Sequence, residues 1–130
     1  MIKLINLESH NDSRGSLVAI EYPRNIPFEV KRVYYLFNNQ ENLERGKHAH
    51  KKLKQVYIAL AGSCIVEFDN GKEKKSLTLN NPEQGILIDE VIWREIKNIS
   101  KDCVLLVLAD EIYKEEDYIR DYNEFIDFIK

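Results

Sequence analysis

The hydrophobic positions of residues 1–109 form short runs that are separated by turn residues. The runs have the length of β-strands and recur at intervals typical of an all-β sandwich or barrel. The predicted strands are residues 17–21, 30–37, 56–60, 64–68, 77–79, 85–88, 91–96 and 103–109.

Two turns are predicted between these runs. Cys64, Val66 and Phe68 alternate with Ile65 and Glu67, and residues 69–71 then read Asp-Asn-Gly. Asn-Gly supplies the positive φ values that a tight hairpin requires, so the sequence predicts a β-hairpin there. Residues 81–85 read Asn-Pro-Glu-Gln-Gly and predict a second turn, because proline fixes φ and glycine lets the chain reverse.

The pattern changes after Ala109. Tyr118, Tyr122, Phe125 and Ile129 recur at spacings of four, three and four residues, which places them on one face of an amphipathic helix. We therefore predict one or two helices within residues 114–130. They would pack on a β body of about residues 1–109, in a single domain that spans residues 1–130.

Composition and charge narrow the class of protein. A chain of 130 residues that is 44% hydrophobic and 32% charged is typical of one soluble domain with a core of its own. No stretch approaches the ~20 apolar residues of a membrane span, and the first eight residues lack a secretory signal, so we expect a cytoplasmic protein with no membrane partner. The net charge of −3 argues against nucleic acid as a partner. Cys64 and Cys103 lie in separate apolar runs, which predicts buried free thiols.

Two of the three histidines, His48 and His50, stand two positions apart. Side chains alternate along a strand, so both rings are expected on the same face. Imidazole has an unperturbed pKa of ~6.5, which makes the pair a candidate for proton transfer, for metal binding or for a hydrogen-bonded core position. A metal needs three or four ligands. His10 lies in a polar N-terminal turn and Gln55 is a poor ligand, so we expect no metal.

The residues around the pair resemble the first cupin motif. Gly46-x-His48-x-His50 is followed by Gln55 and then by Gly62. Metal-binding cupins carry a glutamate where Gln55 stands, and no histidine follows His50 to complete the second motif. The motif predicts the fold, and its departures favour proton chemistry over metal binding.

A closer resemblance covers nearly the whole chain. In five separated blocks the sequence is similar to the nucleotide-linked 4-keto-6-deoxyhexose 3,4-ketoisomerases, a family of small cupins. The blocks are residues 12–17 (Asp-Ser-Arg-Gly-Ser-Leu), 31–35 (Lys-Arg-Val-Tyr-Tyr), 45–51 (Arg-Gly-x-His-Ala-His-Lys), 93–95 (Trp-Arg-Glu) and 117–122 (Asp-Tyr-Ile-Arg-x-Tyr).

This resemblance implies a jelly-roll cupin fold, a homodimer that exchanges N-terminal strands, and catalysis with no metal or other cofactor. The implied substrate is dTDP-4-keto-6-deoxyglucose. The implied product is a dTDP-3-keto-6-deoxyhexose, which is transaminated to an amino sugar for antibiotics or for bacterial surface glycans such as lipopolysaccharide. Asp89-Glu90 stand where family members more often carry proline or glycine, so we expect a different turn at the rim of the pocket.

Moving a ketone from C4 to C3 requires a base that removes the C3 proton and an acid that returns a proton to C4. We assign His48 as the base and His50 as its partner, and the reverse order stays open. Tyr34 and Tyr35 are adjacent, so only one faces the interior. We expect Tyr35 to face inward with Val33 and to act as an acid or as a donor to the sugar oxygen.

Four arginines lie in the blocks, and a pyrophosphate is best held by such planar, bidentate cations. They are Arg14, Arg32, Arg45 and Arg94. Trp93 is a candidate to stack on the sugar or the base, with core packing as the alternative role. The remaining aromatic residues of the C-terminal region are expected to pack within the helical tail: Tyr113, Tyr118 and Tyr122.

Two alternatives to isomerisation stay open. One is a sugar nucleotide 3,5-epimerase of related cupin form, which would pair its base histidine with an aspartate; no such pair is evident in the sequence. The other is a cupin that binds a sugar nucleotide without catalysis. The nucleotide and the product configuration at C4 also stay open.

Overall fold

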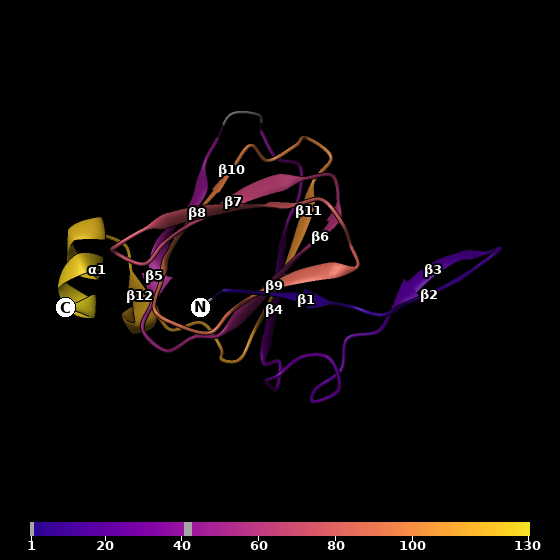
Figure 1. The fold of residues 1–130 in the computed structure, drawn as a ribbon, viewed down its shortest axis with the longest axis horizontal. Coiled ribbons are helices and arrows are strands. Elements are labelled where there is room, and N and C mark those ends of the chain that lie inside the picture. The colour runs from indigo at the N-terminus through magenta and orange to yellow at the C-terminus, as the bar shows by residue number, and fades with distance from the viewer. Residues whose placement is uncertain (1, 41–42) are drawn as a thin grey trace.

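The computed structural model describes residues 2–40 and 43–130. Two five-stranded antiparallel sheets stack face to face, with a helix at one end and a two-stranded arm at the other (Figure 1). The first sheet has the order β1-β9-β6-β11-β4, the second has the order β12-β5-β10-β7-β8, and β2 and β3 form the arm. This confirms the predicted all-β jelly-roll fold with a C-terminal helix, although the sheets do not close into a complete barrel.

The strands are two to seven residues long. The first sheet is built from β1 (Lys3–Asn6), β9 (Gln84–Ile88), β6 (Gln55–Ala61), β11 (Val104–Ala109) and β4 (Arg32–Leu36). The second is built from β12 (Tyr118–Ile119), β5 (Arg45–His50), β10 (Trp93–Lys97), β7 (Cys64–Asp69) and β8 (Lys74–Leu79). The arm is β2 (Ser9–Asp12) and β3 (Gly15–Val18), and the helical elements are η1 (Glu115–Asp117) and α1 (Tyr122–Ile129).

Each of the eight runs predicted as strands overlaps one of these strands. Their inward residues form the core between the sheets, with Tyr57, Leu105 and Val107 from the first sheet meeting Val66 and Phe68 from the second. Cys64 and Cys103 are buried free thiols, as expected. Four of the described strands lie outside the predicted runs. β1, β2 and β12 are only two to four residues long, and β5 has six residues but no apolar run.

The predicted hairpin joins β7 to β8, and its loop is longer than the Asn-Gly pair suggests. Asp69 pairs with Lys74, so residues 70–73 form the connection. Gly71 takes a φ of +91°, and its N–H donates to Oδ1 of Asp69 over 2.7 Å. The positive φ is therefore needed at the glycine within a four-residue loop.

The C-terminal region is less helical than predicted. Only residues 122–129 form an α-helix, in which Phe125 is the buried residue and the Asp121 side chain caps the N-terminus. Tyr118 lies in β12 and pairs with His50, and Ile119 pairs with Ala49. The segment before the helix therefore adds an edge strand to the second sheet. No helix among the described residues is long and apolar enough to cross a membrane.

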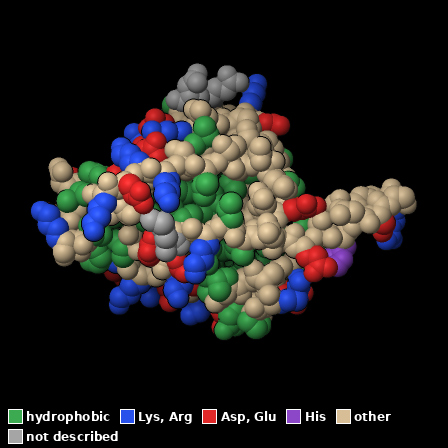
Figure 2. Space-filling view, in the orientation of Figure 1, with side chains coloured by type: hydrophobic (Ala, Val, Ile, Leu, Met, Phe, Trp, Pro, Cys, Tyr) green, Lys and Arg blue, Asp and Glu red, His purple; other side chains and the backbone are tan. Residues whose placement is uncertain are grey.

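The outer face of the first sheet carries a second apolar layer. Residues 19–31 cross this face, and Ile26 and Phe28 pack against Val56 and Ile58 of β6. The cover does not extend over β4 or the end of β6, where Val33, Tyr35, Phe37 and Leu60 are all exposed. The arm stands away from the body (Figure 2).

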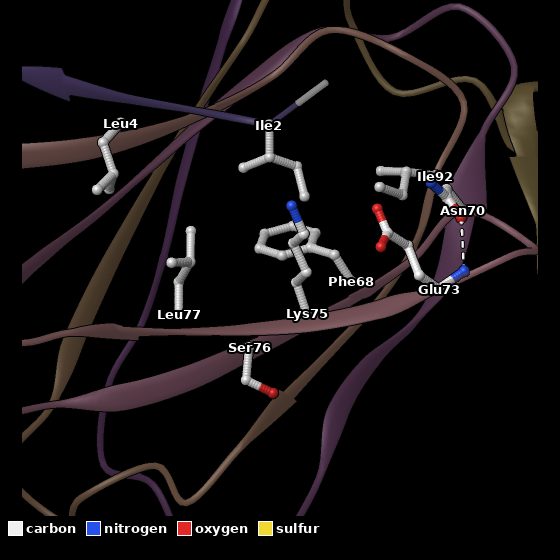
Figure 3. A pocket seen from close by; sticks show the side chains of 9 residues that line it. All are labelled: Ile2, Leu4, Phe68, Asn70, Glu73, Lys75, Ser76, Leu77 and Ile92. Carbon is white, nitrogen blue, oxygen red and sulfur yellow. Dashed lines mark hydrogen bonds between the residues drawn. The ribbon is translucent and has the colours of Figure 1, made fainter.

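The sandwich opens along two edges. The edge between β1 and β8, which we call the apolar seam, holds a cavity of about 420 Å³. Ile2, Phe68, Leu77 and Ile92 line it, with polar side chains at its rim (Figure 3). The opposite edge, between β4 and the β12–β5 pair, we call the polar seam.

Candidate active site

The polar seam contains a cavity of about 370 Å³ that is lined by cationic, aromatic and imidazole side chains. Its walls come from β4, β5, β6, β10, β11 and β12 together with the residue after β12. The residues with chemistry are Arg32, Tyr34, Arg45, Lys47, His48, Tyr57, Tyr118 and Arg120. The second sheet thus supplies the histidines and the first sheet supplies the facing wall.

A bulge in β5 aims the histidine pair into the sandwich. Arg94 of β10 pairs with His48, but Ile96 pairs with Arg45, so two β5 residues oppose one β10 residue. Gly46 lies in this bulge with a φ of +68°, and a Cβ there would sit 3.2 Å from Cδ1 of Ile96. Glycine is therefore required by both the backbone conformation and the space.

The two histidine rings lie together, as strand alternation predicts. Their centroids are 4.7 Å apart and the ring planes are nearly perpendicular. Tyr118 packs on both, with centroid distances of 5.2 Å to His48 and 4.3 Å to His50. His48 is 8% exposed and His50 is 1% exposed, so neither ring is an ordinary surface group.

His50 has a carboxylate partner that the sequence did not reveal. Its Nδ1 lies 2.9 Å from Oδ2 of Asp117, and the backbone N–H of Lys52 donates to Oδ1 of the same carboxylate over 2.8 Å. The expectation that the chain has no histidine–aspartate pair was therefore wrong. The two residues are 67 positions apart, and only the pairing of β12 with β5 brings them together.

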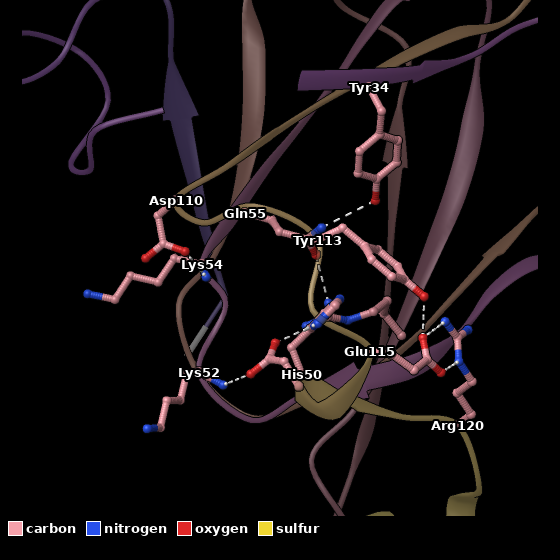
Figure 4. A network of polar contacts seen from close by, with 11 residues as sticks. Tyr34, His50, Lys52, Lys54, Gln55, Asp110, Tyr113, Glu115 and Arg120 are labelled. Atoms are coloured by element: carbon pink, nitrogen blue, oxygen red, sulfur yellow. Dashed lines mark hydrogen bonds and ion pairs between the residues drawn. The ribbon is translucent and has the colours of Figure 1, made fainter. Parts of the chain in front are cut away.

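A chain of polar contacts runs beneath the histidines. Nη1 of Arg94 donates to Oε1 of Gln55 over 2.8 Å, and Nε2 of Gln55 donates to the Tyr34 hydroxyl over 3.2 Å (Figure 4). Arg94 and Gln55 are completely buried. Because Gln55 is neutral, it leaves the Arg94 charge uncompensated. Because Tyr34 accepts from Gln55, the hydroxyl proton of Tyr34 remains available for donation.

Burial and this positive charge keep both histidines neutral. Burial, followed by the charge of Arg94, lowers the pKa of His48 to about 2 and the pKa of His50 to about 3. The Asp117 carboxylate acts against the lowering at His50, but that ring is fully buried and remains neutral near pH 7. Burial also raises the pKa of Tyr34. Both imidazoles are thus available to accept a proton, and Tyr34 is held in its protonated form.

The polar seam also gathers the buried atoms whose hydrogen bonding is incomplete. Within the described part of the chain, the buried side-chain atoms with no partner in the protein are Nη1 of Arg32, Nε2 of His48, Nε2 of His50, and Nε and Nη2 of Arg94. Buried polar groups are normally paired, and unpaired charge is costly. Five such atoms in the polar seam, on residues that line its two hollows or lie behind them, indicate a site built for a polar ligand.

Tyr34, not Tyr35, faces the cavity. Tyr35 is 59% exposed on the outer face of the first sheet, where its ring lies 5.7 Å from that of Phe37, and Val33 is exposed beside it. The predicted orientation of this strand was therefore wrong by one residue. Both faces of β4 carry apolar side chains, so alternation alone did not identify the inward one.

The four arginines divide into three groups. Arg32 and Arg45 line the cavity, and the guanidinium of Arg32 lies over the ring of Tyr34 at 4.7 Å. Arg94 is buried beneath the histidines. Arg14 lies in the turn of the arm, paired with Asp12 over 2.6 Å, and does not contribute to the cavity of its own chain.

Trp93 does not face the cavity. It precedes the inward Arg94 on β10 and points to the outer face of the second sheet, where it packs with Ala49, Ile119 and Phe125. Its Nε1 donates to Oε2 of Glu95 over 3.1 Å. The expectation that Trp93 contacts a substrate is not supported, and the alternative of core packing is correct.

Sequence analysis missed part of the C-terminal wall. Arg120 lies over the ring of Tyr118 at 4.2 Å and forms a bidentate ion pair with Glu115, with N–O distances of 2.7 and 2.8 Å. The Tyr113 hydroxyl donates to the same Glu115 carboxylate. Treating residues 114–130 as helical placed these side chains on a packing face. The block at residues 117–122 was the available signal that this segment belongs to the site.

Comparisons with known proteins agree with this geometry. The FdtA family (WxcM-like, C-terminal) matches residues 1–130. A TDP-4-oxo-6-deoxy-α-D-glucose-3,4-oxoisomerase of Aneurinibacillus thermoaerophilus is 49% identical over 127 residues, which cover 98% of this chain and 91% of that protein.

Solved structures show the same relationship. A 3,4-ketoisomerase from Helicobacter canadensis is 45% identical with a TM-score of 0.96, over 98% of this chain and 96% of that chain. A variant of the 3,4-ketoisomerase QdtA from Thermoanaerobacterium thermosaccharolyticum, solved with TDP-4-keto-6-deoxyglucose, is 42% identical with a TM-score of 0.96, over 98% and 93% of the two chains.

The 3,5-epimerase RmlC of Legionella pneumophila is only 15% identical, with a TM-score of 0.77 over 91% of this chain and 71% of that chain, which shows a common fold. The similarity to the ketoisomerases named above is much greater, with identities of 42–49% and a family match over the full length. The chain belongs to the FdtA (WxcM-like, C-terminal) family, as the five sequence blocks and the polar seam both indicated.

Proposed function

We propose that this protein is a sugar nucleotide 3,4-ketoisomerase that converts dTDP-4-keto-6-deoxyglucose into a dTDP-3-keto-6-deoxyhexose. The observation that carries the proposal is the pair of buried, neutral histidines beside an uncompensated guanidinium, each histidine lining one of two adjoining hollows of the polar seam. The relatives named above are 3,4-ketoisomerases, and one was solved with the same keto sugar.

The reaction moves protons and leaves the overall oxidation state unchanged. His48 takes the proton from C3, and the electrons of the C–H bond form an enediolate with its negative charge on the C4 oxygen. Protonation of that oxygen gives the enediol. Loss of the proton from the C3 hydroxyl and protonation at C4 then leave the ketone at C3. His50 is the partner that exchanges protons with His48 or the sugar, and a positioned acid or base of this kind contributes about 10²–10⁴ in rate.

Arg94 and Tyr34 fit the role of stabilising the enediolate. The guanidinium is fully buried and donates to the neutral Gln55, so its charge is available to an anion formed nearby. Tyr34 holds a free hydroxyl proton beside it. Preorganised donors of this type are worth most in a site with little water, because the local dielectric constant is low.

The positive charge of Arg94 also supports a reaction that needs no metal. His48 lines the cavity, and His50 lines an adjoining hollow that shares Arg32 and Tyr118 with it. Gln55 stands where a carboxylate ligand would be needed. Arg94 lowers the pKa of both rings by its positive charge and would repel a divalent cation in the same way. Among the described residues, no group of three potential ligands converges on one point.

The nucleoside diphosphate fits at the mouth of the cavity. Arg32, Arg45 and Arg120 line it, together with Lys47. Arginine forks bind phosphate oxygens in pairs, which favours them for a pyrophosphate in a protein of net charge −3. A TDP complex of QdtA, a 43% identical relative, supports the choice of nucleotide.

We also propose a homodimer in which the arm reaches across to the second subunit. Val33, Tyr35 and Phe37 form an exposed apolar row on β4, continuous with the layer that residues 19–31 cover. Among the described residues, the arm pairs with no other strand of its own sheets, and it exposes Leu17. An arm laid over the partner's β4 would bury these residues and bring Arg14 toward the partner's cavity. In this arrangement β1 keeps its place in its own sheet, so the exchanged strands are β2 and β3.

Light scattering of the eluted protein tests the dimer. Tyr35→Lys should produce monomers, because it places charge in the middle of the apolar row. Thr78→Lys, on the exposed face of β8, is the matched control and should remain dimeric. A wild-type monomer would refute the proposal.

The reaction is tested by incubating the protein with dTDP-4-keto-6-deoxyglucose in deuterated water and following the sugar ring by NMR. We expect deuterium at C4 and a ketone at C3. Exchange at C3 and C5 with the ketone retained at C4 would instead indicate an epimerase, whose base histidine would also have an aspartate neighbour. Absence of any exchange would favour a binding protein. Cytoplasmic location and use of the product for amino sugars of surface glycans remain predictions.

A further inference from the structure

Asp117 is connected to the segment that carries the histidines by three hydrogen bonds. Its Oδ2 contacts Nδ1 of His50, its Oδ1 accepts from the Lys52 N–H, and its backbone oxygen accepts from the Lys51 N–H over 2.9 Å. The His50 side chain is 0% exposed and that of Asp117 is 16% exposed. The carboxylate therefore holds one orientation relative to the ring.

This arrangement determines which ring nitrogen of His50 carries the proton. An ionised carboxylate only accepts hydrogen bonds, so Nδ1 of His50 must donate to it. In the neutral ring, Nε2 is then the nitrogen with a free lone pair. That Nε2 is buried and has no partner in the protein. The His50 ring lines a hollow of about 170 Å³ that shares Arg32 and Tyr118 with the cavity at His48, so Nε2 is available to a group that enters there.

We propose that Asp117 is a positioning residue that fixes His50 in the Nδ1–H tautomer, so that Nε2 is the nitrogen that exchanges a proton during the reaction. The effect on turnover rests on the proposed isomerase function, whereas the effect on the tautomer does not. The proposal leaves His48 as the base that attacks C3. It states that the partner ring functions only while Asp117 selects its tautomer.

The hydrogen bond from the Lys52 N–H determines how the amide of an Asp117→Asn variant would be oriented. In Asp117→Asn, the amide oxygen is the group able to accept from Lys52, so it should occupy the position of Oδ1. The amide nitrogen then faces His50 and donates to Nδ1. His50 must accept at Nδ1 and carry its proton on Nε2. The substitution changes few atoms and reverses the tautomer.

Asp110 supplies a matched control. Its Oδ1 accepts from the backbone N–H of Lys54 over 2.9 Å, and its own N–H donates to the Lys54 oxygen over 3.1 Å. It thus makes the same kind of carboxylate-to-backbone contact two residues further along, with no histidine attached (Figure 4). Asp110→Asn removes a charge of the same sign from the neighbouring loop and should leave His50 unchanged.

The test is long-range ¹H–¹⁵N NMR on protein labelled at its three histidines, combined with steady-state kinetics. In the wild type at pH 7 we expect a protonated Nδ1 and an unprotonated Nε2 for His50, assigned with His50→Asn. Asp117→Asn should shift the proton to Nε2 and lower kcat by about 10²–10⁴, as loss of the correct tautomer does in acid–base sites. KM should change by much less, and Asp110→Asn should match the wild type in both measurements.

The NMR measurement on the wild type needs neither a variant nor a substrate. If His50 carries its proton on Nε2 there, the proposal is wrong even if the protein is an efficient isomerase. If Asp117→Asn keeps the wild-type tautomer or the wild-type kcat, the proposal is also wrong. If the wild type shows the expected tautomer but does not isomerise the keto sugar, the proposed function fails and the positioning of His50 by Asp117 stands.

Discussion

The two open seams of the sandwich have opposite chemistry. At the apolar seam, Phe68, Leu77 and Ile92 face a cavity and continue the hydrophobic core. At the polar seam, His48, His50 and Arg94 are as deeply buried but keep atoms without partners in the protein. Both seams lie between the same pair of sheets. Apolar packing therefore stabilises the fold at one edge, whereas buried polar groups without partners reduce its stability at the other edge, where the reactive site lies.

The polar seam also differs in how it is closed. The apolar seam is bordered by β1 and β8, regular edge strands of four and six residues. The polar seam is closed by the two-residue β12 and by a wall of side chains, with Tyr118 against the histidines and Arg120 over Tyr118. The site is therefore assembled from segments far apart in sequence, and the residues that complete it lie near the C-terminus.

The largest effect is expected at the histidines. His48→Asn and His50→Asn should each lower kcat by about 10²–10⁴, because each removes a group that accepts or returns a proton. The unfolding midpoint of His48→Asn should stay near that of the wild type, since Nε2 of His48 has no partner. His50→Asn should also lower the midpoint, because it removes the contact between Nδ1 and Asp117. Steady-state kinetics and urea unfolding on the same samples measure both quantities. Unchanged turnover in both variants would contradict the assignment.

The apolar seam should show the reverse behaviour. Phe68→Ala removes a ring that is 1% exposed and should lower the free energy of unfolding by about 3–5 kcal/mol through lost burial and a new cavity. The kcat of the folded fraction should remain that of the wild type. A large loss of kcat with little loss of stability would show that the two seams are not separate in function.

A substitution at Arg94 tests whether the buried charge of the polar seam lowers the stability of the fold. Arg94→Met should lower kcat by about 10²–10³, because the enediolate loses its charged neighbour. The same substitution removes a buried charge without an anionic partner, which favours a gain of about 1–4 kcal/mol in the free energy of unfolding. It also leaves Oε1 of Gln55 unpaired, at a cost of about 1–3 kcal/mol, so the net gain should be smaller. A variant that is both inactive and less stable would indicate that Arg94 supports the fold instead.

The pH dependence of stability should come from the polar seam. The folded-state pKa values of His48 and His50 lie at about 2 and about 3, below the ordinary value of 6.5. Below pH 6.5 the unfolded chain binds protons that the folded chain does not, so stability falls as pH decreases. Well below pH 6.5 the slope approaches about 1.4 kcal/mol per pH unit for each histidine. Urea unfolding should show a shallow slope near pH 7 that steepens toward this value at pH 5, and His50→Asn should remove about half of it.

The sequence predicted what depends on local pattern. Alternation identified eight of the strands, and the spacing of His48 and His50 placed both rings together. Alternation did not identify the inward side chains where both faces of a strand are apolar. Tyr35 was chosen over Tyr34 because the outer face of β4 is as hydrophobic as the inner one. The direction of the Trp93 side chain could not be predicted for the same reason, since both faces of the second sheet carry a core cluster.

The sequence also failed to predict contacts between residues that lie far apart in the chain. Asp117 and His50 are 67 residues apart, and the strand that joins them has only two residues. A two-residue strand has no periodicity to detect, and the helical spacing of residues 118–129 extended across it. Resemblance marked the block at 117–122 as important but did not assign Asp117 to His50. That pairing required the folded structure.

The central claim is that the polar seam moves the C3 proton of a keto sugar. The most direct measurement is the rate at which dTDP-4-keto-6-deoxyglucose labelled with deuterium at C3 loses its label in ordinary water. We expect the wild type to release the label during turnover and the double variant His48→Asn/His50→Asn to release it no faster than buffer alone. Release by the double variant at a rate near that of the wild type would contradict the claim.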